Sequence, residues 1–410
     1  MLLANWPTAF AHVDCDAFYA SCERARRPDL KHVPVCVLSN QEAFVVAKTY
    51  DAKRLGVTTA MSVRDARKIV PHAAFLPPDF AYYGQMSDRV FAVLRRFSPG
   101  VELYSIDEAF ISMQGLRSLW RKSYRDLADE IRETVKHEVG ITVSIGVSVT
   151  KTLAKIASES NKPDGVAIVP GRKIADFLRG ITVKDVPGIA DSRRALLNLF
   201  GIETAADYAN APLALIQRLV GKVGTDLWHE LRGEAVFPLE LEPKLPKLIA
   251  RTASMGEITS NRDRIAAHLA HHVTRLATEL VTKRYLAGRI VFYLELRTFE
   301  SFGAECRLPY PTASYFALWS AAEQALDQLY APGSLYRACG VIASGIILAD
   351  RSTQDLFGVV AREEREARLM ATVDDINRKY GKGTAAMLAT RLIKHQRRAA
   401  RFRYPVIAVR

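Results

Sequence analysis

The stretch ELYSIDEAFISM, residues 102–113, places two adjacent carboxylates, Asp107 and Glu108, in a run whose other residues favour a packed β-strand. An ionised carboxylate in such surroundings costs several kcal/mol unless a partner group is present. Two interpretations follow. The segment is either a hairpin whose turn falls at Asp-Glu, or part of a cation site that needs a third carboxylate from elsewhere in the chain.

Asp14 is the candidate for the third carboxylate, because it follows a predicted strand at residues 10–13. Two neighbouring strands, one ending in Asp and one carrying Asp-Glu, can hold divalent cations on shared oxygen ligands. Successive strand residues point to opposite faces of a sheet. Asp107 and Glu108 therefore reach one site only near a strand end, a bulge or a hairpin.

The composition limits the class of protein. A chain of 410 residues is too long for one compact core and predicts two to four domains. The longest apolar run, residues 339–349, is shorter than the roughly 20 residues that span a bilayer. The first residues lack the basic region and cleavage site of a signal peptide, so we expect a cytoplasmic protein. The five cysteines are scattered without a C-x-x-C pair, which supports neither a disulfide framework nor a zinc site.

The formal net charge of +13 implies a polyanionic partner. Nucleic acid fits better than a membrane surface, because the chain shows no strong basic amphipathic helix. We therefore expect no membrane partner. A basic protein without any polyanionic partner stays open as an alternative.

Strands and helices alternate through about the first 170 residues, which predicts an α/β or α+β domain. The expected strands lie at 10–13, 34–38 and 141–149, and the expected helices at 82–96 and 117–138, with a strand turning into a helix at 43–57. Residues 171–240 are expected to be mostly helical. Two prolines in residues 241–250 predict a linker, and residues 251–350 a second α+β domain.

Several separate motifs together resemble the Y-family (translesion) DNA polymerases in order and spacing. They are HVDCDAFYASCE (12–23), YSIDEAF (104–110), SIGVSVTKTLAKIASESNKPDG (144–165) and VPGI (186–189). CERARRPDL, VCVLSNQ, TKTLAK and LMATVDDINRKYGKGT are closest to the UmuC-type catalytic subunit of bacterial DNA polymerase V. VDCDAFYA and KPDG are closer to the DinB (polymerase IV) type.

The resemblance implies an α+β multidomain right hand. Its expected parts are a palm at 1–16 and 79–170, fingers at 17–78, a helical thumb with a helix-hairpin-helix at 171–240, a linker at 241–250, an α+β little finger at 251–350, and a C-terminal clamp peptide with a basic tail at 351–410.

The resemblance also implies a catalytic site. Asp14, Asp107 and Glu108 are expected to hold two Mg²⁺ ions, with the backbone carbonyl of Cys15 as a further ligand. Asp16 also matches the motif, although an N-cap of the following helix is an open alternative. The residues implied to contact the nucleotide are Phe18, Tyr19, Tyr50, Lys53 and Lys162.

Among these, Tyr19 matches the steric gate that excludes a ribose 2′-hydroxyl, with an ordinary core aromatic as the alternative. Lys53 stands where many members have Arg, and it keeps the charge without the bidentate fork. Ala47 replaces a Ser or Thr that contacts phosphate in polymerase IV relatives, so that hydrogen bond is absent.

Further positions are expected to contact DNA or a partner. Gly188 and Arg193 lie in the predicted helix-hairpin-helix, for which an ordinary helix pair is the alternative, and Ala190 replaces its usual second glycine. Arg397 and Arg398 lie in a tail that carries no acidic residue from Lys382 onward. The segment STQDLFGVV resembles a sliding-clamp-binding peptide, with an exposed linker as the alternative; its expected clamp contacts are Gln354, Leu356 and Phe357.

The function implied is a low-fidelity, template-directed DNA polymerase for translesion synthesis in the SOS response, which transfers a nucleotide from a dNTP to a primer 3′-hydroxyl. The implied partners are primer–template DNA, dNTPs, the sliding clamp, and, for the polymerase V type, a UmuD′-like dimer and a RecA filament. Two other classes stay open: a non-catalytic Y-family-like scaffold in a mutagenic complex, and a nucleotidyl cyclase with a palm-like carboxylate site.

Overall fold

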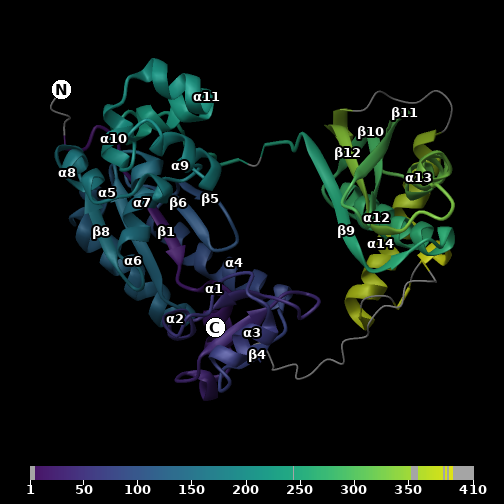
Figure 1. Cartoon of the computed structure of the whole chain (residues 1–410), viewed down its shortest axis with the longest axis horizontal. Coiled ribbons are helices and arrows are strands. Elements are labelled where there is room, and N and C mark those ends of the chain that lie inside the picture. Colours follow the sequence, from purple (N-terminus) through teal and green to yellow (C-terminus); the bar gives the residue numbers. More distant parts are fainter. Residues whose placement is uncertain (1–4, 243, 352–358, 382–383, 386, 391–410) are drawn as a thin grey trace. The chain divides into compact units, whose positions relative to one another are not determined.

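The computed structural model describes residues 5–242, 244–351, 359–381, 384–385 and 387–390. The chain forms two compact units, Met1–Pro243 and Lys244–Arg410 (Figure 1). Among the described residues, no helix has the length and apolar character needed to cross a membrane.

The centre of unit 1 is a five-stranded sheet in the order β5-β6-β1-β7-β8. Its strands are β1 (Phe10–Cys15), β5 (Val101–Leu103), β6 (Glu108–Ser112), β7 (Val143–Ser148) and β8 (Val166–Val169). All pairs are antiparallel except β7 with β8. The helices associated with this sheet are α4 (Phe80–Phe97), α5 (Leu116–Trp120), α6 (Tyr124–Val139) and α7 (Lys151–Ser160).

Two helix layers explain why strand β7, between β1 and β8, is buried along its whole length. Val143, Ile145 and Val147 join the core that also contains residues of α4 and α6. On the other face, Gly146 lets α7 come close, since a Cβ there would lie 2.1 Å from the carbonyl oxygen of Ala154. The close approach of α7 brings its polar side chains to the same face of the sheet as His12, which pairs with Gly146.

Two smaller parts complete unit 1. The first is a three-stranded sheet in the order β3-β2-β4, made of β2 (Val35–Leu38), β3 (Val45–Lys48) and β4 (Ala74–Leu76). Its neighbouring helices are α1 (Phe18–Arg26), η1 (Pro28–Leu30), α2 (Tyr50–Arg54) and α3 (Val63–Ile69). The second is helical: η2 (Gly171–Lys173), α8 (Ile174–Arg179), η3 (Val183–Asp185), α9 (Asp191–Asn198), α10 (Ala205–Asn210) and α11 (Leu213–Leu231).

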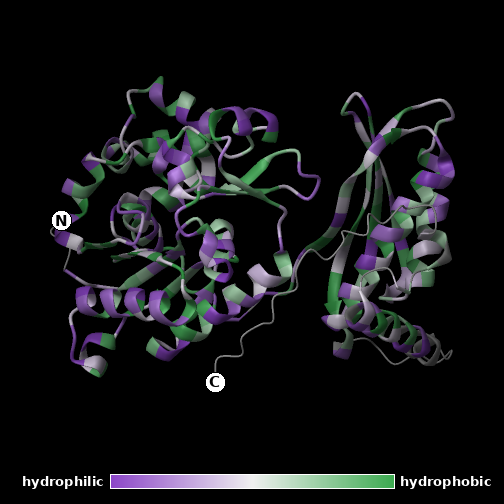
Figure 2. Ribbon diagram, turned by 90° about the horizontal axis from the view of Figure 1, so that it is seen from below, coloured by the Kyte–Doolittle hydropathy of each residue, from purple (hydrophilic) through white to green (hydrophobic). Residues whose placement is uncertain are grey.

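Unit 2 is a four-stranded antiparallel sheet in the order β11-β10-β12-β9, packed against helices. Its elements are β9 (Leu248–Thr259), α12 (Arg262–Thr282), β10 (Tyr285–Leu296), β11 (Ser301–Thr312), α13 (Tyr315–Leu329), β12 (Tyr336–Leu348), η4 (Ala349–Arg351), α14 (Val359–Tyr380) and η5 (Leu388–Thr390). Figure 2 shows hydrophobic and hydrophilic residues alternating along the helices, as expected for amphipathic helices that cover a core with one face.

Three sequence predictions need correction. The stretch 102–113 is not one strand but two, β5 and β6, joined by a turn. The helix expected at 117–138 is split into α5 and α6, because Arg121 is left-handed and Ser123 begins a new helix with a capping box. Residues 186–202 contain one helix, α9, rather than two, since the chain is extended at Val186 and turns at Gly188, where φ is +89°.

Two boundaries also differ from the expected divisions. Strand β9 begins at Leu248, inside the range predicted as a linker. The region predicted as a clamp peptide and basic tail contains α14, which packs against α12 and contributes Met370 to the core of unit 2.

Candidate active site

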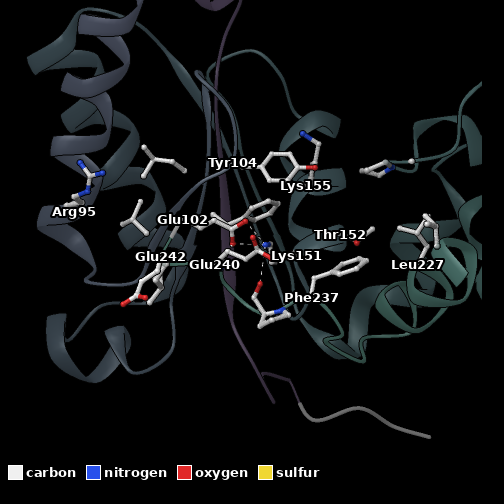
Figure 3. A pocket seen from close by; sticks show the side chains of 18 residues that line it. Arg95, Glu102, Tyr104, Lys151, Thr152, Lys155, Leu227, Phe237, Glu240 and Glu242 are labelled. Carbon is white, nitrogen blue, oxygen red and sulfur yellow. Dashed lines mark hydrogen bonds and ion pairs between the residues drawn. The ribbon is translucent and has the colours of Figure 1, made fainter. Parts of the chain in front are cut away.

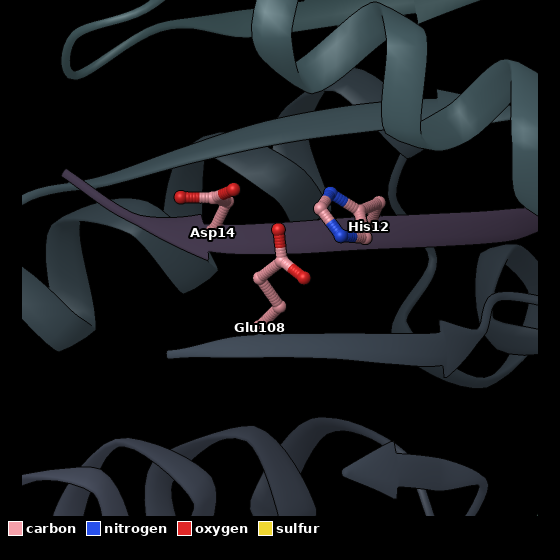
Figure 4. Close-up of side chains that lie close together, drawn as sticks. All are labelled: His12, Asp14 and Glu108. Carbon is pink, nitrogen blue, oxygen red and sulfur yellow. The ribbon is translucent and has the colours of Figure 1, made fainter. Parts of the chain in front are cut away.

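Asp14 and Glu108 come together at one end of the central sheet of unit 1, and Asp107 lies in the turn directly before Glu108. Asp14 on β1 is directly opposite Glu108 on β6 in the antiparallel register. The next residue of β1, Cys15, donates its backbone N–H to the carbonyl oxygen of Asp107 at 2.9 Å. Figure 4 shows Asp14 and Glu108 projecting toward the same region from the two strands, with His12 beside them.

The turn between β5 and β6 puts Asp107 and Glu108 within reach of one site. The backbone N–H groups of Tyr104 and Ser105 both donate to the carbonyl oxygen of Glu108, at 3.0 and 3.1 Å. The Ser105 hydroxyl lies 2.6 Å from Asp107 Oδ1 and orients that carboxylate. A hairpin is therefore present, but its turn falls at residues 104–107 rather than at Asp-Glu, and Glu108 already belongs to β6.

Two lysines pair with the carboxylates. Lys162 Nζ lies 2.7 Å from Asp14 Oδ1, and Lys155 contacts Glu108. Burial nevertheless raises the pKa of Asp14 to about 8, although the charge of Lys162 opposes this shift. The carboxyl group is thus placed where its ionised form needs more positive charge than the lysine supplies.

The donor set fits a divalent cation. Ligand atoms of Asp14, Glu108 and His12 lie within 4.8 Å of one another. Carboxylate oxygens of this kind are the ligands that Mg²⁺ accepts in proteins. A bound cation would favour the ionised carboxylate of Asp14 and so oppose the effect of burial on its pKa.

A polar cavity of about 430 Å³ adjoins the carboxylates. It brings together all the residues that the sequence predicted as metal ligands or nucleotide contacts: Asp14, Cys15, Phe18, Tyr19, Tyr50, Lys53, Asp107, Glu108 and Lys162. Lys48, Thr59 and Glu159 also line it and were not predicted. The cavity therefore combines an acidic end with lysine and aromatic walls.

The aromatic residues are held by mutual stacking. Tyr19 stacks on Tyr83 with ring centroids 4.6 Å apart and an interplanar angle of 16°, and Phe80 meets its ring edge-on. Tyr19 is only partly buried and lines the cavity, while Phe18 beside it belongs to the core. Tyr50 begins α2, and Lys53 lies over its ring with Nζ 5.8 Å from the centroid.

Asp16 is not the N-cap that the sequence left open. Helix α1 begins at Phe18 after Ala17, and no side chain caps it. The buried carboxylate of Asp16 instead accepts hydrogen bonds from the Ser144 hydroxyl and the Asp164 backbone N–H, both at 2.8 Å. Asp16 thereby fastens the end of β1 to β7 and to the loop that carries Lys162.

Sequence reasoning missed two functional candidates, Lys155 and His12. Lys155 lies within the quoted TKTLAK motif, but nothing local indicates that α7 carries it to Glu108. His12 precedes Asp14 by two residues and so shares its face of β1, which is the only signal that the sequence offers.

The expected DNA and clamp contacts lie apart from this cavity or outside the described residues. Gly188 is in a left-handed turn, and its carbonyl oxygen accepts a hydrogen bond from Arg193 Nη1 at 2.7 Å. Gln354, Leu356, Phe357, Arg397 and Arg398 lie outside the described part of the chain.

A second cavity of unit 1, of about 880 Å³, lies beside β5 and the N-terminus of α7 (Figure 3). Glu102 and Lys151 form an ion pair in its wall, and Lys151 also donates to the carbonyl oxygen of Pro238 at 3.3 Å. Buried Glu230 accepts N–H bonds from Thr152 and Val236, at 2.9 and 2.7 Å. These contacts fix residues 236–240 to β5, which carries Glu102, and to α7, which carries Lys151 and Lys155.

Comparison with solved structures identifies the class of fold. The chain is similar to a structure described as "Y-family DNA polymerase chimera Dbh-Dpo4(243-245)-Dbh", with a TM-score of 0.71 and 24% identity over 83% of this chain and 99% of that chain. It is also similar to DinB from Sulfolobus solfataricus, with a TM-score of 0.56, 23% identity and the same coverage. The fold is therefore that of Y-family DNA polymerases.

Sequence comparison identifies the family. Residues 13–159 match the impB/mucB/samB family, and residues 246–356 match its C-terminal domain. DNA polymerase IV of Moorella thermoacetica is 32% identical over 90% of this chain and 92% of its own length. Protein UmuC of Salmonella typhimurium is 31% identical over 92% of both chains. The chain belongs to the impB/mucB/samB family of Y-family DNA polymerases. The similar identities do not separate the UmuC and DinB types.

Proposed function

We propose that this chain is a translesion DNA polymerase whose catalytic ligands are Asp14, Asp107, Glu108 and the backbone carbonyl of Cys15. The observation that carries the proposal is the register that sets Asp14 opposite Glu108 at the edge of a cavity lined by Lys53 and Lys162. Carboxylates for cations and ammonium groups for phosphates are the two features that nucleotidyl transfer from a dNTP needs.

Two Mg²⁺ ions, when bound, supply activation of the primer 3′-hydroxyl and neutralisation of the triphosphate charge. Asp14 and Glu108 would hold these cations in place of their present contacts with Lys162 and Lys155. Lys162 Nζ, which lies 2.7 Å from Asp14 Oδ1 in this structure, would then be free to donate to a phosphate oxygen of the dNTP. Lys53 and Tyr50, at the start of α2, contact the same triphosphate.

Tyr19 acts as the sugar gate. Its ring is fixed against Tyr83 and faces the cavity, so a ribose 2′-hydroxyl would meet a ring that cannot easily move aside. Val46 lines the same cavity with a small side chain. Small side chains leave room for distorted base pairs, which is the property that damage bypass requires.

The wider assignments follow the same proposal. The palm comprises residues 1–16 and 79–170, the fingers 17–78 and the thumb 171–240. Residues 241–247 link the thumb to the little finger, which begins with β9 at Leu248 and extends to residue 350. Gly188, Arg193, Arg397 and Arg398 contact DNA backbone, and Gln354, Leu356 and Phe357 bind the sliding clamp. A UmuD′-like dimer and a RecA filament are proposed partners in the cytoplasm, because relatives include a protein named UmuC.

The test is primer extension with labelled dNTPs on undamaged and lesion-containing templates. A translesion polymerase extends both primers, and extension stops on addition of a metal chelator. A scaffold extends neither. A cyclase produces a labelled cyclic nucleotide without any template, so analysis of the nucleotide products separates it from the other two classes.

A further inference from the structure

Glu23 is a buried carboxylate that the proposed reaction does not use. It lies on α1, and its side chain is only 2% exposed. It follows Tyr19 by four residues, so the two side chains share one face of the helix. A buried carboxylate is costly unless it is paired and hydrogen-bonded. The partners of Glu23 therefore show what it holds in place.

Arg26 pairs with this carboxylate. Its guanidinium group donates to both carboxylate oxygens of Glu23, at 2.8–3.1 Å. It also donates to Asp79 Oδ2 at 2.8 Å. Asp79 is the N-cap of α4, since its side chain accepts from the backbone N–H of Tyr82. The ion pairs thus fasten α1 to the first turn of α4.

Tyr83 on α4 is a further partner of Glu23. Its hydroxyl oxygen lies 2.7 Å from Glu23 Oε1. Burial raises the pKa of Tyr83, and the charge of Glu23 raises it further, so the hydroxyl keeps its proton and donates. Hydrogen bonds to a charged acceptor are among the stronger ones. This bond fixes the outer end of the Tyr83 side chain, while the backbone of α4 fixes the other end.

The ring of Tyr83 supports the ring of Tyr19. The two rings lie within 16° of parallel with centroids 4.6 Å apart. Phe80 meets both rings edge-on, with centroids 5.8 Å from Tyr19 and 6.0 Å from Tyr83. Tyr83 is fully buried, whereas Phe80 is 46% exposed. Tyr83 is therefore the firmer of the two supports.

We propose that Tyr83 is a positioning residue for sugar discrimination, whose ring supports Tyr19 against a ribose 2′-hydroxyl and whose own position is set by Glu23. To admit the 2′-hydroxyl, Tyr19 has to leave the stack. The lost stacking then adds to the free-energy difference between ribonucleotide and deoxynucleotide incorporation. The inference rests on the proposed role of Tyr19 as the sugar gate, and it makes the selectivity of that gate depend on a buried residue of α4.

The experiment measures the catalytic efficiencies of single ribonucleotide and deoxynucleotide incorporation by the full chain on primer–template DNA. Tyr83→Leu removes the stack and is expected to raise the ribonucleotide-to-deoxynucleotide ratio by about twofold to tenfold, the range that corresponds to one aromatic contact. Tyr83→Phe keeps the ring but loses the bond to Glu23, and it is expected to raise the ratio less. Both changes are expected to come from faster ribonucleotide incorporation.

Tyr208→Phe is the matched control. Tyr208 is also fully buried, and its hydroxyl donates to the carbonyl oxygen of Gly224 at 3.0 Å in the helical part of unit 1. A general loss of stability lowers both efficiencies together, so the ratio of this control is expected to stay at the wild-type value. With Tyr19→Ala already present, Tyr83→Leu is expected to leave the ratio unchanged, because the ring that it supports is gone.

Two outcomes overturn the proposal. One is a wild-type ratio for either Tyr83 variant, and the other is an equal rise in the ratio with and without the Tyr19 ring. Tyr19→Ala alone tests the underlying gate separately. An unchanged ratio there refutes the gate itself, whereas a raised ratio there, together with wild-type ratios for the Tyr83 variants, refutes only the support by Tyr83.

Discussion

The buried ion pair of Glu102 and Lys151 predicts that removing one partner destabilises unit 1 much more than removing both. Lys151 Nζ lies 2.8 and 2.6 Å from the two carboxylate oxygens of Glu102, and the side chains are 9% and 8% exposed. Glu102→Gln leaves the ammonium group of Lys151 buried without its counter-charge. Breaking a buried pair in this way costs about 3–5 kcal/mol. The double variant Glu102→Gln/Lys151→Met leaves no buried charge and should be much less destabilised than either single variant.

Calorimetric unfolding of the full chain measures this effect. For a unit of this size, a loss of about 3–5 kcal/mol lowers the midpoint of the unit 1 transition by roughly 10 °C. Asp176→Asn is the matched control, because it breaks an ion pair with Arg179 whose side chains are 76% and 73% exposed. Exposed pairs contribute about 0–1 kcal/mol. The reasoning would be refuted if Glu102→Gln lowered the midpoint of the unit 1 transition as little as the control does. It would also be refuted if the double variant lost as much stability as the two single variants added together.

Three further predictions concern the gate, the packing of α7 and the C-terminal tail. Tyr19→Ala should raise incorporation of ribonucleotides relative to deoxynucleotides in single-nucleotide kinetics, and an unchanged ratio would assign the gate elsewhere. Gly146→Ala should destabilise unit 1 by about 3 kcal/mol or more, because the added Cβ meets backbone at 2.1 Å, whereas Gly84→Ala in α4 meets nothing within 4 Å and should be neutral or stabilising. Deletion of residues 385–410 should flatten the salt dependence of duplex DNA binding by a slope of roughly 0.9 per lost phosphate contact, and an unaltered slope would argue against a DNA-binding tail.

The acidic part of the site could be predicted from the sequence because it depends on local features of two strands. A strand that ends in Asp14 and a turn before Glu108 need only neighbouring strands to bring their carboxylates together. The expected nucleotide contacts came from the family resemblance, and they share one cavity in the structure.

The contacts that the sequence did not reveal depend on packing between segments that are far apart in the chain. Lys155 reaches Glu108, and Ser158 reaches His12, only because α7 crosses the sheet at Gly146, more than 130 residues after His12. Asp16 resembled a helix cap by its position, but its partners Ser144 and Asp164 come from distant segments. The break between α5 and α6 escaped prediction because the apolar spacing continues through it, while the left-handed residue at the break is Arg121 rather than a glycine.

The most direct test of the central claim is single-nucleotide incorporation by the chain with Asp107→Asn or Glu108→Gln, measured together with its affinity for primer–template DNA. Asp176→Asn serves as the exposed carboxylate control. If Asp107 and Glu108 hold the catalytic cations, both variants lose incorporation by orders of magnitude and bind DNA with nearly wild-type affinity, while the control is unaffected. Near-normal incorporation by either variant would contradict the account.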